Sequence, residues 1–409
     1  MEHLRDMLLF KDDSDFTVTY KLNKVNGIFN WYPYTEGFSK PFVDKMLDYF
    51  GASTHSLIMD PFSGCGTTAL ACTLRSTPSI SIEVNPFMNF VGKTKTESLV
   101  LDMGKLKEYH KKILDEIKIS NKKDLEVPSF IKDKPFFDED NLNEALMIKN
   151  AILRTIKGEP RYCNFFLLHL SSILVKISNM IRAVDLRYRK NKQGKLDVLT
   201  IYTEKIEKAF NDLNDCNLPS ETETLFFNED ICNISDDLGD YTNKVDFFIT
   251  SPPYLNGTNY DRNTKLEMGF LNLIKNDMDL HELRTKMVIA GINSTHTKNV
   301  YRTDLSFINS LIEEVKKHAY DRRIPIMVHG YFNDMAIAIQ NISKLMKPGG
   351  KGVIVIGDSQ FGGVHIETDL ILARICEIQG LRVEKIDVVR ERRSKNGMKL
   401  RESLIFVIK

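Results

Sequence analysis

The chain has 409 residues, enough for one large catalytic domain with an inserted module, and 42% of them are hydrophobic, enough to build a substantial core. It carries 56 Lys and Arg against 55 Asp and Glu, a formal net charge of +1. This balance excludes a uniformly basic protein, so any nucleic-acid surface must come from local clustering of charge.

The cysteines and the hydropathy pattern indicate the cellular compartment in which this protein is expected. None of the six cysteines forms a Cys-x-x-Cys pair, which favours a reducing compartment and predicts no zinc site. No apolar run reaches the length of a membrane span, and the first residues are too acidic for a secretory signal. We therefore expect a soluble, cytoplasmic protein with no membrane contact and no bound metal.

The N-terminal region divides into a polar and an aromatic segment. Residues 1–27 are polar and mixed, and we interpret them as an arm. Residues 30–39 are aromatic, contain the only Trp of the chain, and suit a hydrophobic lid over a sheet edge. Ser39 can cap a helix with Pro41 in its first turn, which we expect to continue to about residue 50.

A glycine-bearing turn follows an apolar strand at 56–59. Gly64 and Gly66 lie in this turn, and a helix is predicted from Thr67 onward. A strand, Gly-x-Gly and helix in this order let the backbone approach a nucleotide-like ligand closely. About 20 residues on, a strand at 79–82 ends in Glu83, where a carboxylate can accept hydrogen bonds from ribose hydroxyls. No Gly-Lys-Ser/Thr follows the glycines, so a P-loop is not indicated.

The middle of the chain, from residue 102 to about 215, is predicted to be helical. Residues 164–175 are too apolar for an exposed helix and should pack against the core. The stretch 181–195 that follows is basic, with aromatic and amide residues interleaved. It either contacts DNA phosphates and base edges or is a solvated helix end. The candidate DNA-binding residues there are Arg182, Arg187, Arg189 and Lys190.

Two strands in the second half end in chemically distinctive residues. A strand at 224–228 runs into Glu229 and Asp230. A strand at 246–249 runs into Thr-Ser-Pro-Pro-Tyr, residues 250–254, where two prolines remove N–H donors and stiffen the elbow. A hydroxyl, outward carbonyls and an aromatic face on this elbow can hold a planar base by its amino group. The alternative is an ordinary strand-ending turn.

The C-terminal part continues the alternation of strands and helices. The polar, irregular stretch 276–302 is a candidate DNA-facing loop. A second basic cluster at 390–395 includes the candidate DNA-binding residues Arg392 and Arg393. The remaining predicted elements are helices near 304–318, 331–346 and 366–378, a strand at 352–358, and an antiparallel strand pair at 385–389 and 403–408. The pattern predicts an α/β fold with a mainly parallel sheet and one reversed strand.

The sequence Asp60-Pro-Phe-Ser-Gly-Cys-Gly-Thr-Thr68, together with Thr250-Ser-Pro-Pro-Tyr254, resembles the amino-group DNA methyltransferases that use S-adenosylmethionine. These enzymes make N4-methylcytosine or N6-methyladenine, and many belong to bacterial restriction-modification systems. The resemblance covers roughly residues 28–90 and 225–409. It implies a Rossmann-like, seven-stranded methyltransferase sheet with a helical insert. The expected domains are an arm (1–27), a cofactor-binding half (28–100), a helical insert that is a candidate for target recognition (101–220), and a catalytic half (221–409).

The resemblance also implies roles for individual residues. Ser251, Pro252, Pro253 and Tyr254 correspond to the catalytic tetrapeptide, with the base flipped out of the duplex and stacked on Tyr254. The residues that correspond to cofactor contacts are Tyr34, Asp60, Phe62, Gly64, Gly66, Thr67, Thr68, Glu83 and Asp230. Glu229 is a rival of Asp230 for the adenine amino group, and the segment that contains Tyr34 corresponds to a cover over the methionine end.

Serine in the first position of the tetrapeptide is commoner in the family for cytosine N4, whereas Asp or Asn is commoner for adenine N6. We therefore favour N4 methylation of cytosine in duplex DNA, with adenine N6 as the alternative. Methylation at cytosine C5 is set aside because the chain has no Pro-Cys. The sequence also leaves open an RNA or protein-amide methylase, a nicotinamide-dependent oxidoreductase, and a catalytically silent DNA-binding protein.

The order of the motifs leaves the recognition segment open. Many Ser-Pro-Pro-Tyr methylases place that motif before the glycine motif, whereas here it follows. The segments that could read the target are the insert, the 276–302 stretch, or both together. The resemblance implies protection of host DNA, with a separate restriction endonuclease as the expected partner.

Overall fold

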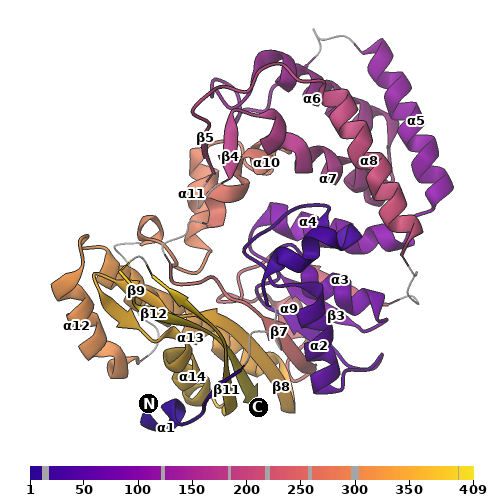
Figure 1. The fold of residues 1–409 in the computed structure, drawn as a ribbon. Coiled ribbons are helices and arrows are strands. Elements are labelled where there is room, and N and C mark those ends of the chain that lie inside the picture. The colour runs from indigo at the N-terminus through magenta and orange to yellow at the C-terminus, as the bar shows by residue number, and fades with distance from the viewer. Residues whose placement is uncertain are drawn as a thin grey trace.

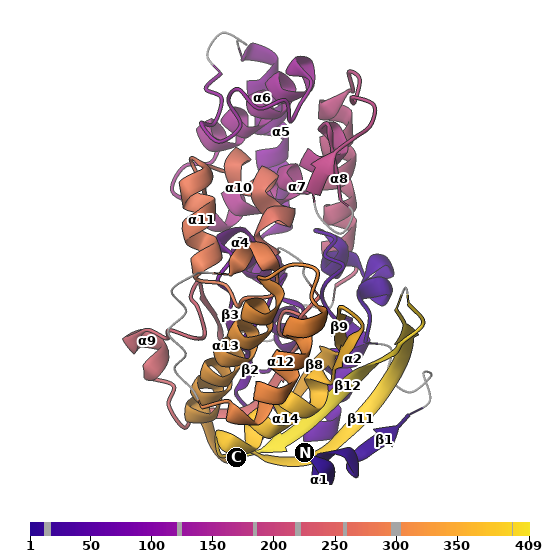
Figure 2. The same cartoon turned by 90° about the vertical axis from the view of Figure 1, so that its left-hand side faces the viewer.

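A computed structural model describes residues 1–11, 18–120, 125–182, 186–216, 222–256, 260–295, 304–394 and 396–409. A lobe built on a twisted sheet lies below a lobe made mostly of helices (Figure 1). A view turned by 90° shows the same arrangement, with helices α10 (Lys265–Phe270) and α11 (Asp277–Thr285) between the two lobes (Figure 2). Among the described residues, no helix is both long and apolar enough to cross a membrane.

The described residues form a main sheet of eight strands in the order β1-β11-β12-β8-β7-β2-β3-β6. Strand β12 runs antiparallel to both of its neighbours, and the other pairings are parallel. The strands are β1 (Leu8–Phe10), β2 (Ile58–Asp60), β3 (Ser79–Ile82), β6 (Thr224–Phe227), β7 (Val245–Thr250), β8 (Met346–Gly357), β11 (Arg382–Arg393) and β12 (Lys399–Ile408). The predicted Rossmann-like methyltransferase fold, with its antiparallel C-terminal pair, is confirmed.

The number of strands corrects the sequence prediction. Without β1, the sheet has the seven expected strands. The eighth comes from the segment interpreted as a polar arm, because Leu8–Phe10 pairs in parallel with Ile386–Val388 on β11. Three residues are too few to show an alternating pattern, so the polarity of the surrounding sequence concealed this edge strand.

The central strands are apolar on both faces because helices cover both sides of the sheet. Alternate residues belong to different core clusters: Ile58 and Ile249 contribute to one, Met59 and Phe248 to the other. Helices α2 (Lys40–Phe50), α3 (Thr67–Leu74) and α4 (Pro86–Glu97) belong to the first cluster. Helices α12 (Asn309–His318), α13 (Ile324–Leu345) and α14 (Thr368–Ile378) belong to the second. The predicted Ser39 cap is present, since the Ser39 side chain accepts a hydrogen bond from the Phe42 N–H.

The helical domain consists of four long helices and a short hairpin. These are α5 (Met103–Ile119), α6 (Glu139–Thr155), α7 (Pro160–Ile177), α8 (Val198–Asn214) and the hairpin β4 (Met180–Arg182) with β5 (Leu186–Tyr188). Helices α5, α6 and α8 each begin at an Asp whose carboxylate accepts a backbone N–H. As predicted, α7 is buried. The first core cluster continues from the sheet into these helices, so the two lobes share one core.

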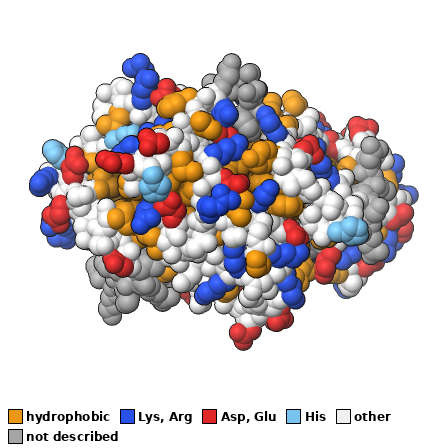
Figure 3. Space-filling model, turned by 90° about the horizontal axis from the view of Figure 1, so that it is seen from below, with side chains coloured by type: hydrophobic (Ala, Val, Ile, Leu, Met, Phe, Trp, Pro, Cys, Tyr) orange, Lys and Arg blue, Asp and Glu red, His pale blue; other side chains and the backbone are white. Residues whose placement is uncertain are grey.

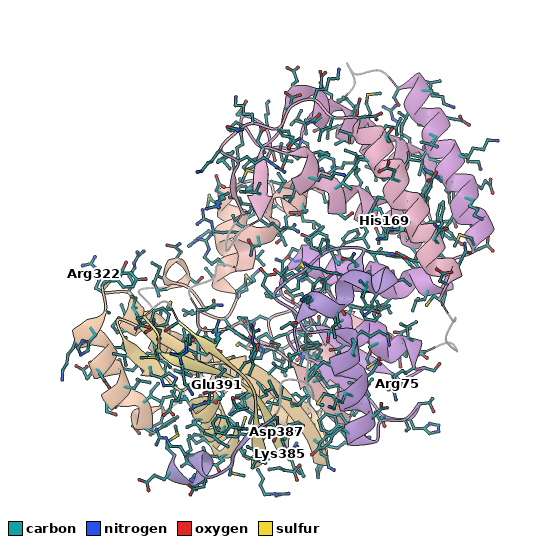
Figure 4. All side chains as sticks on the ribbon, viewed as in Figure 1. Arg75, His169, Arg322, Lys385, Asp387 and Glu391 are labelled. Carbon is teal, nitrogen blue, oxygen red and sulfur yellow. The ribbon has the colours of Figure 1, made fainter. Side chains whose placement is uncertain are left out.

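His169 lies inside the helical domain (Figure 4). It is on α7, is fully buried, and packs edge-on against Trp31 at 4.7 Å and Phe165 at 4.6 Å between ring centroids. Burial lowers its pKa well below the ordinary value. The imidazole is therefore neutral in the folded protein.

The start of the basic stretch 181–195 is a hairpin rather than the end of a helix. Arg182, on β4, pairs with the buried carboxylate of Glu267 on α10 and donates to the Tyr32 hydroxyl. The Tyr32 hydroxyl in turn donates to Glu267 at 3.1 Å. This cluster fastens the hairpin and the aromatic N-terminal segment to α10. Residues 183–185 of the stretch lie outside the described residues.

Candidate active site

The glycine turn between β2 and α3 depends on both of its glycines. Gly64 has φ +49°, and a Cβ there would lie 3.1 Å from the ring of Tyr34. Gly66 has φ +74°, and its Cβ would lie 2.6 Å from the Cα of Gly92 on α4. Gly64 thus lets the turn lie against Tyr34, whereas Gly66 lets α3 approach α4 backbone to backbone. Gly66 therefore has a packing role in addition to the ligand contact that the sequence predicts for it.

Asp60 connects the two motifs. Its carboxylate accepts a hydrogen bond from Thr68 Oγ1 at 2.7 Å and from Thr250 Oγ1 at 2.9 Å. Thr68 belongs to the glycine motif, and Thr250 directly precedes Ser251. Burial raises the pKa of Asp60, and the two hydrogen bonds lower it. Burial has the larger effect, so the pKa is about 6. A single carboxylate therefore fixes the positions of two segments 190 residues apart in the chain.

Glu83 follows β3 and is hydrogen-bonded to the glycine turn that follows the neighbouring strand β2. One carboxylate oxygen accepts from the Gly64 N–H at 2.8 Å, and the other accepts from the Asn85 N–H at 2.8 Å. Burial raises the pKa of Glu83 to about 7, and these two backbone donors lower it. The side chain follows β3, as predicted, and the ribose contact expected of it stays a prediction.

These groups line one cavity of about 920 Å³, which we call the motif cavity. It lies at the carboxyl ends of β2, β3 and β7, where ligands bind in open α/β sheets. The predicted site residues that line it are Tyr34, Asp60, Phe62, Gly64, Thr67, Glu83, Asp230, Ser251, Pro252 and Pro253. Gly66, Thr68 and Tyr254 are not among the lining residues. Five lining side chains are carboxylates (Glu36, Asp60, Glu83, Glu229 and Asp230) and one is an amine, Lys286.

Some lining residues were not predicted as cofactor contacts. Asn85 caps α4 with its side chain and donates to Thr264, which also lines the cavity. Met287 and Val288 line it from the stretch expected to be a DNA-facing loop, which begins instead with helix α11. The Asn-Pro that follows Glu83 was a usable signal for Asn85, whereas nothing local marks the 287–288 segment. Residues 296–303, at the end of that stretch, lie outside the described residues.

Glu229 and Asp230 both line the motif cavity, and both have hydrogen bonds within the protein. Glu229 accepts from the Ser235 side chain at 2.7 Å, at the start of α9 (Asp236–Gly239). Asp230 accepts from the Cys232 N–H at 2.8 Å. The choice between them as a cofactor contact stays open.

Tyr254 is half-buried and held from two sides. Its ring lies against Gly357 at the end of β8, since a Cβ at Gly357 would be 3.0 Å from the ring. Its hydroxyl donates to Glu402 on β12 at 3.1 Å. Arg392 lies nearby and donates to the Asp358 carbonyl at 3.1 Å. The second basic cluster therefore begins beside the tetrapeptide, while Arg393 is exposed on the same strand.

The remaining candidate DNA-binding residues differ in how they are held. Arg182 is engaged in the internal cluster with Glu267 described above, so its charge is already paired. Arg189 donates to the carbonyls of Ser178 and Val175 at the end of α7. Arg187 and Lys190 are exposed. Within the described chain, no group of three or more His, Cys, Asp or Glu side chains is arranged to hold a metal ion.

The sheet order and a cavity formed jointly by the glycine turn and the Ser-Pro-Pro-Tyr elbow define a Rossmann-like methyltransferase fold. No protein-family model matches the chain. The sequence is similar to the Type II methyltransferase M.BsoBI of Geobacillus stearothermophilus, with 23% identity over 94% of this chain and 84% of the relative. It is also similar to the Type II methyltransferase M.AvaI of a Nostoc strain, with 25% identity over 95% of this chain and 86% of the relative.

A third relative, the Type II methyltransferase M.MjaII of Methanocaldococcus jannaschii, is 29% identical over 145 residues, 30% of this chain. The first two alignments span both motifs and the helical domain that separates them. The resemblance to methyltransferases of restriction-modification systems, drawn from two short motifs, is thus confirmed at the level of the whole chain.

Proposed function

We propose that the protein is a site-specific DNA methyltransferase that transfers a methyl group from S-adenosylmethionine to the exocyclic N4 amino group of cytosine in duplex DNA. The observation that carries this proposal is the convergence of the two motifs on one cavity, joined by the hydrogen bonds of Asp60. The similarity to Type II methyltransferases over most of the chain supports the enzyme class.

The lining of the motif cavity fits S-adenosylmethionine. The cofactor carries a net positive charge, and the lining has five carboxylates to one amine. In this proposal Glu83 accepts hydrogen bonds from the ribose hydroxyls, and Asp230 or Glu229 accepts one from the adenine amino group. All three line the cavity, and Tyr34 lies against the turn at Gly64. When bound, the cofactor supplies an electrophilic methyl group on a sulfonium sulfur.

The tetrapeptide provides what an exocyclic amine needs. Such an amine is a weak nucleophile because its lone pair is delocalised into the ring. Hydrogen bonds from the amine to the Ser251 hydroxyl and the Pro252 carbonyl favour a pyramidal nitrogen with a localised lone pair. The two prolines fix these acceptors in place, so the catalysis consists of positioning and electrostatics. Tyr254, braced by Gly357 and Glu402, offers the flipped base a stacking surface.

The choice of cytosine over adenine rests on Ser251. A serine in this position is the family's commoner partner for cytosine N4, and its neutral hydroxyl also accommodates adenine N6, which stays the second candidate. The role we propose is protection of the cell's own DNA, with a separate restriction endonuclease as the functional partner. The enzyme then acts in the cytoplasm.

The proposal is tested by expressing the protein in a host that lacks DNA methylation and sequencing the host DNA with detection of modified bases. We expect N4-methylcytosine at one short sequence. N6-methyladenine would replace the cytosine assignment and keep the mechanism. Ser251→Ala should abolish the mark, whereas Ser53→Ala, an exposed serine that does not line the motif cavity, should leave it unchanged. No modified base from the intact protein would contradict the proposal.

A further inference from the structure

A second hollow, of about 1280 Å³, lies where the helical domain meets α10, α11 and the start of α13. We call it the basic hollow. Its cationic lining residues come from four parts of the chain. Lys134 precedes α6, Arg262 precedes α10 and Lys265 begins it, Arg284 lies in the last turn of α11, and Arg323 precedes α13. Neither the sequence motifs nor the proposed catalytic roles account for it.

The charge of this lining departs from that of the molecule. Five lining side chains are cationic and one, Asp277, is anionic, whereas the whole chain has 56 basic and 55 acidic residues. Lys134 pairs with Asp277 at 3.0 Å, and Arg323 pairs at 2.7 Å with Asp321, which is not a lining residue. The lining as a whole has five cations to one acid. On the face shown in Figure 3, by contrast, acidic and basic side chains are interspersed. A concave site with this bias attracts a polyanion.

Three aromatic rings form a column along the hollow. The rings of Phe130 and Phe136 stack with centroids 6.2 Å apart and planes tilted by 29°, and those of Phe136 and Tyr188 stack with centroids 6.0 Å apart and planes tilted by 26°. The two phenylalanines are buried, but Tyr188 at the end of the column is 50% exposed. The Lys134 Nζ lies 3.7 Å from the centroid of Phe130. Tyr188 packs on one side against a buried ring, is exposed to solvent, and lines the hollow together with the cations. Such a ring is suited to stacking on a nucleobase.

The basic hollow adjoins the motif cavity through the same two segments. Thr264 lines the cavity, while Arg262 and Lys265 line the hollow. Likewise Lys286 lines the cavity and Arg284, two residues earlier, lines the hollow. A polyanion in the hollow would therefore lie beside the cavity in which we propose that methyl transfer takes place.

We propose that the basic hollow holds the DNA that flanks the target base, with Tyr188 stacking on a nucleotide and Lys265 and Arg284 neutralising phosphates. The inference rests on the proposed function and adds to it the surface that binds the substrate. It assigns substrate binding to residues outside both motifs. It also places Tyr188, in the middle of the predicted basic stretch 181–195, beside Lys265 and Arg284, which lie more than 70 residues away in the chain.

The charge part of the proposal is tested by fluorescence anisotropy with a labelled duplex oligonucleotide of random sequence, titrated at several salt concentrations. The double variant Lys265→Gln with Arg284→Gln should bind about 10- to 100-fold more weakly, and the slope of log K against log salt should fall by about 2. The matched control removes two exposed lysines of α5, Lys107→Gln with Lys111→Gln, and should change neither quantity.

The stacking part is tested at Tyr188. Tyr188→Ala should weaken DNA binding about 5- to 100-fold without altering the salt slope, because a ring and not a charge is lost. Tyr188→Phe keeps the ring and should bind as the intact protein does. Equal loss in both variants would overturn the stacking role, as would unchanged binding by Tyr188→Ala.

Two further measurements separate this proposal from the proposed function. S-adenosylmethionine binding, followed by calorimetry, should be the same in all these variants, which also shows that they are folded. If the intact protein methylates DNA while the Lys265 and Arg284 double variant keeps full affinity and salt slope, the basic hollow is not the DNA site. If the intact protein binds S-adenosylmethionine but neither binds nor methylates DNA, the proposed function itself fails.

Discussion

The motif cavity and the basic hollow, both lined by described residues, have linings that are opposite in charge and that are built differently. The motif cavity has five carboxylates and one amine in its lining, whereas the basic hollow has five cations and one carboxylate. Two short continuous motifs supply much of the cavity. The hollow combines single residues from segments that stretch from Phe130 to Arg323. The site that we propose for the cofactor is thus encoded locally, and the surface that we propose for DNA is encoded by the fold.

The two regions also differ in how they are fixed. The cavity is fixed by backbone geometry and by one buried carboxylate, Asp60. The helical domain is fixed by a shared core and by polar contacts to α10, which are the Arg182–Glu267 pair and a hydrogen bond from the Lys149 amine to the Phe270 carbonyl. Variants at these contacts test whether the two regions are held in place by different kinds of interaction.

The largest expected effect is at Gly66. Gly66→Ala should lower the free energy of unfolding by about 4 kcal/mol, because the left-handed backbone is strained for alanine and the new Cβ meets the backbone of Gly92. Gly51→Ala is the matched control: it has a similar φ of +70° with nothing within 4 Å, and should cost about 1 kcal/mol. Urea unfolding measures both. Equal losses would show that the α3–α4 contact does not require glycine.

The next effect is at the joint between the lobes. Arg182→Ala should destabilise the protein by about 3 kcal/mol, because Glu267 is left buried without its cation. This loss of stability is at the low end of the range for buried ion pairs because the Arg182 side chain is partly exposed to water. Arg182→Ala combined with Glu267→Gln should recover part of the loss. A drop in DNA affinity with unchanged stability would instead restore Arg182 as a DNA contact.

A smaller effect is expected on cofactor binding at Glu83. Burial raises the pKa of this carboxyl to about 7, so it is mostly protonated at pH 6 and mostly ionised at pH 8. The ionised form accepts ribose hydroxyls better, so the affinity for S-adenosylmethionine should rise between these pH values. Glu83→Gln should weaken binding about 10-fold at pH 8, since a hydrogen bond to a charged group is lost, and should remove most of the pH dependence.

Glu36→Gln serves as the control for Glu83 because it changes another carboxylate of the same cavity. Calorimetry at pH 6, 7 and 8 measures the affinity of each variant for S-adenosylmethionine and shows which carboxylate causes the pH dependence. If Glu36→Gln flattens the pH profile and Glu83→Gln does not, the ribose contact is assigned to the wrong residue.

The smallest effect concerns acid stability of the helical domain. His169 has a lowered pKa in the folded state, so below about pH 6.5 the unfolded chain binds a proton that the folded protein does not. Its contribution to stability is therefore present above pH 6.5 and is lost as the pH falls, by about 1 kcal/mol between pH 6.5 and 5.5. His169→Phe should remove this part of the pH dependence of urea unfolding. An unchanged dependence would show that His169 is not its source.

The sequence was most informative where chemistry depends on consecutive residues. The glycine turn, Glu83 and the Ser-Pro-Pro-Tyr elbow were all predicted because a strand end and its next few residues form the site. It was less informative where one residue has several plausible uses. Arg182 and Arg187 look alike in a basic stretch, yet only Arg182 faces a buried carboxylate, which comes from 85 residues further along the chain.

Three further features could not be predicted because they arise only in the folded chain. Strand β1 is defined by its partner β11 and not by its own pattern. The link from Asp60 to Thr250 joins residues from both halves of the protein. The column of Phe130, Phe136 and Tyr188 brings together rings from an irregular segment and a hairpin. None of these has a local signature.

The central claim, that the Ser251 elbow holds an amine for methylation, is tested most directly by purified Ser251→Ala. Calorimetry measures its binding of S-adenosylmethionine, and transfer of a radiolabelled methyl group to DNA measures its activity. We predict cofactor affinity equal to that of the intact protein and a transfer rate lower by about 100-fold or more. Transfer at the rate of the intact protein would contradict the account.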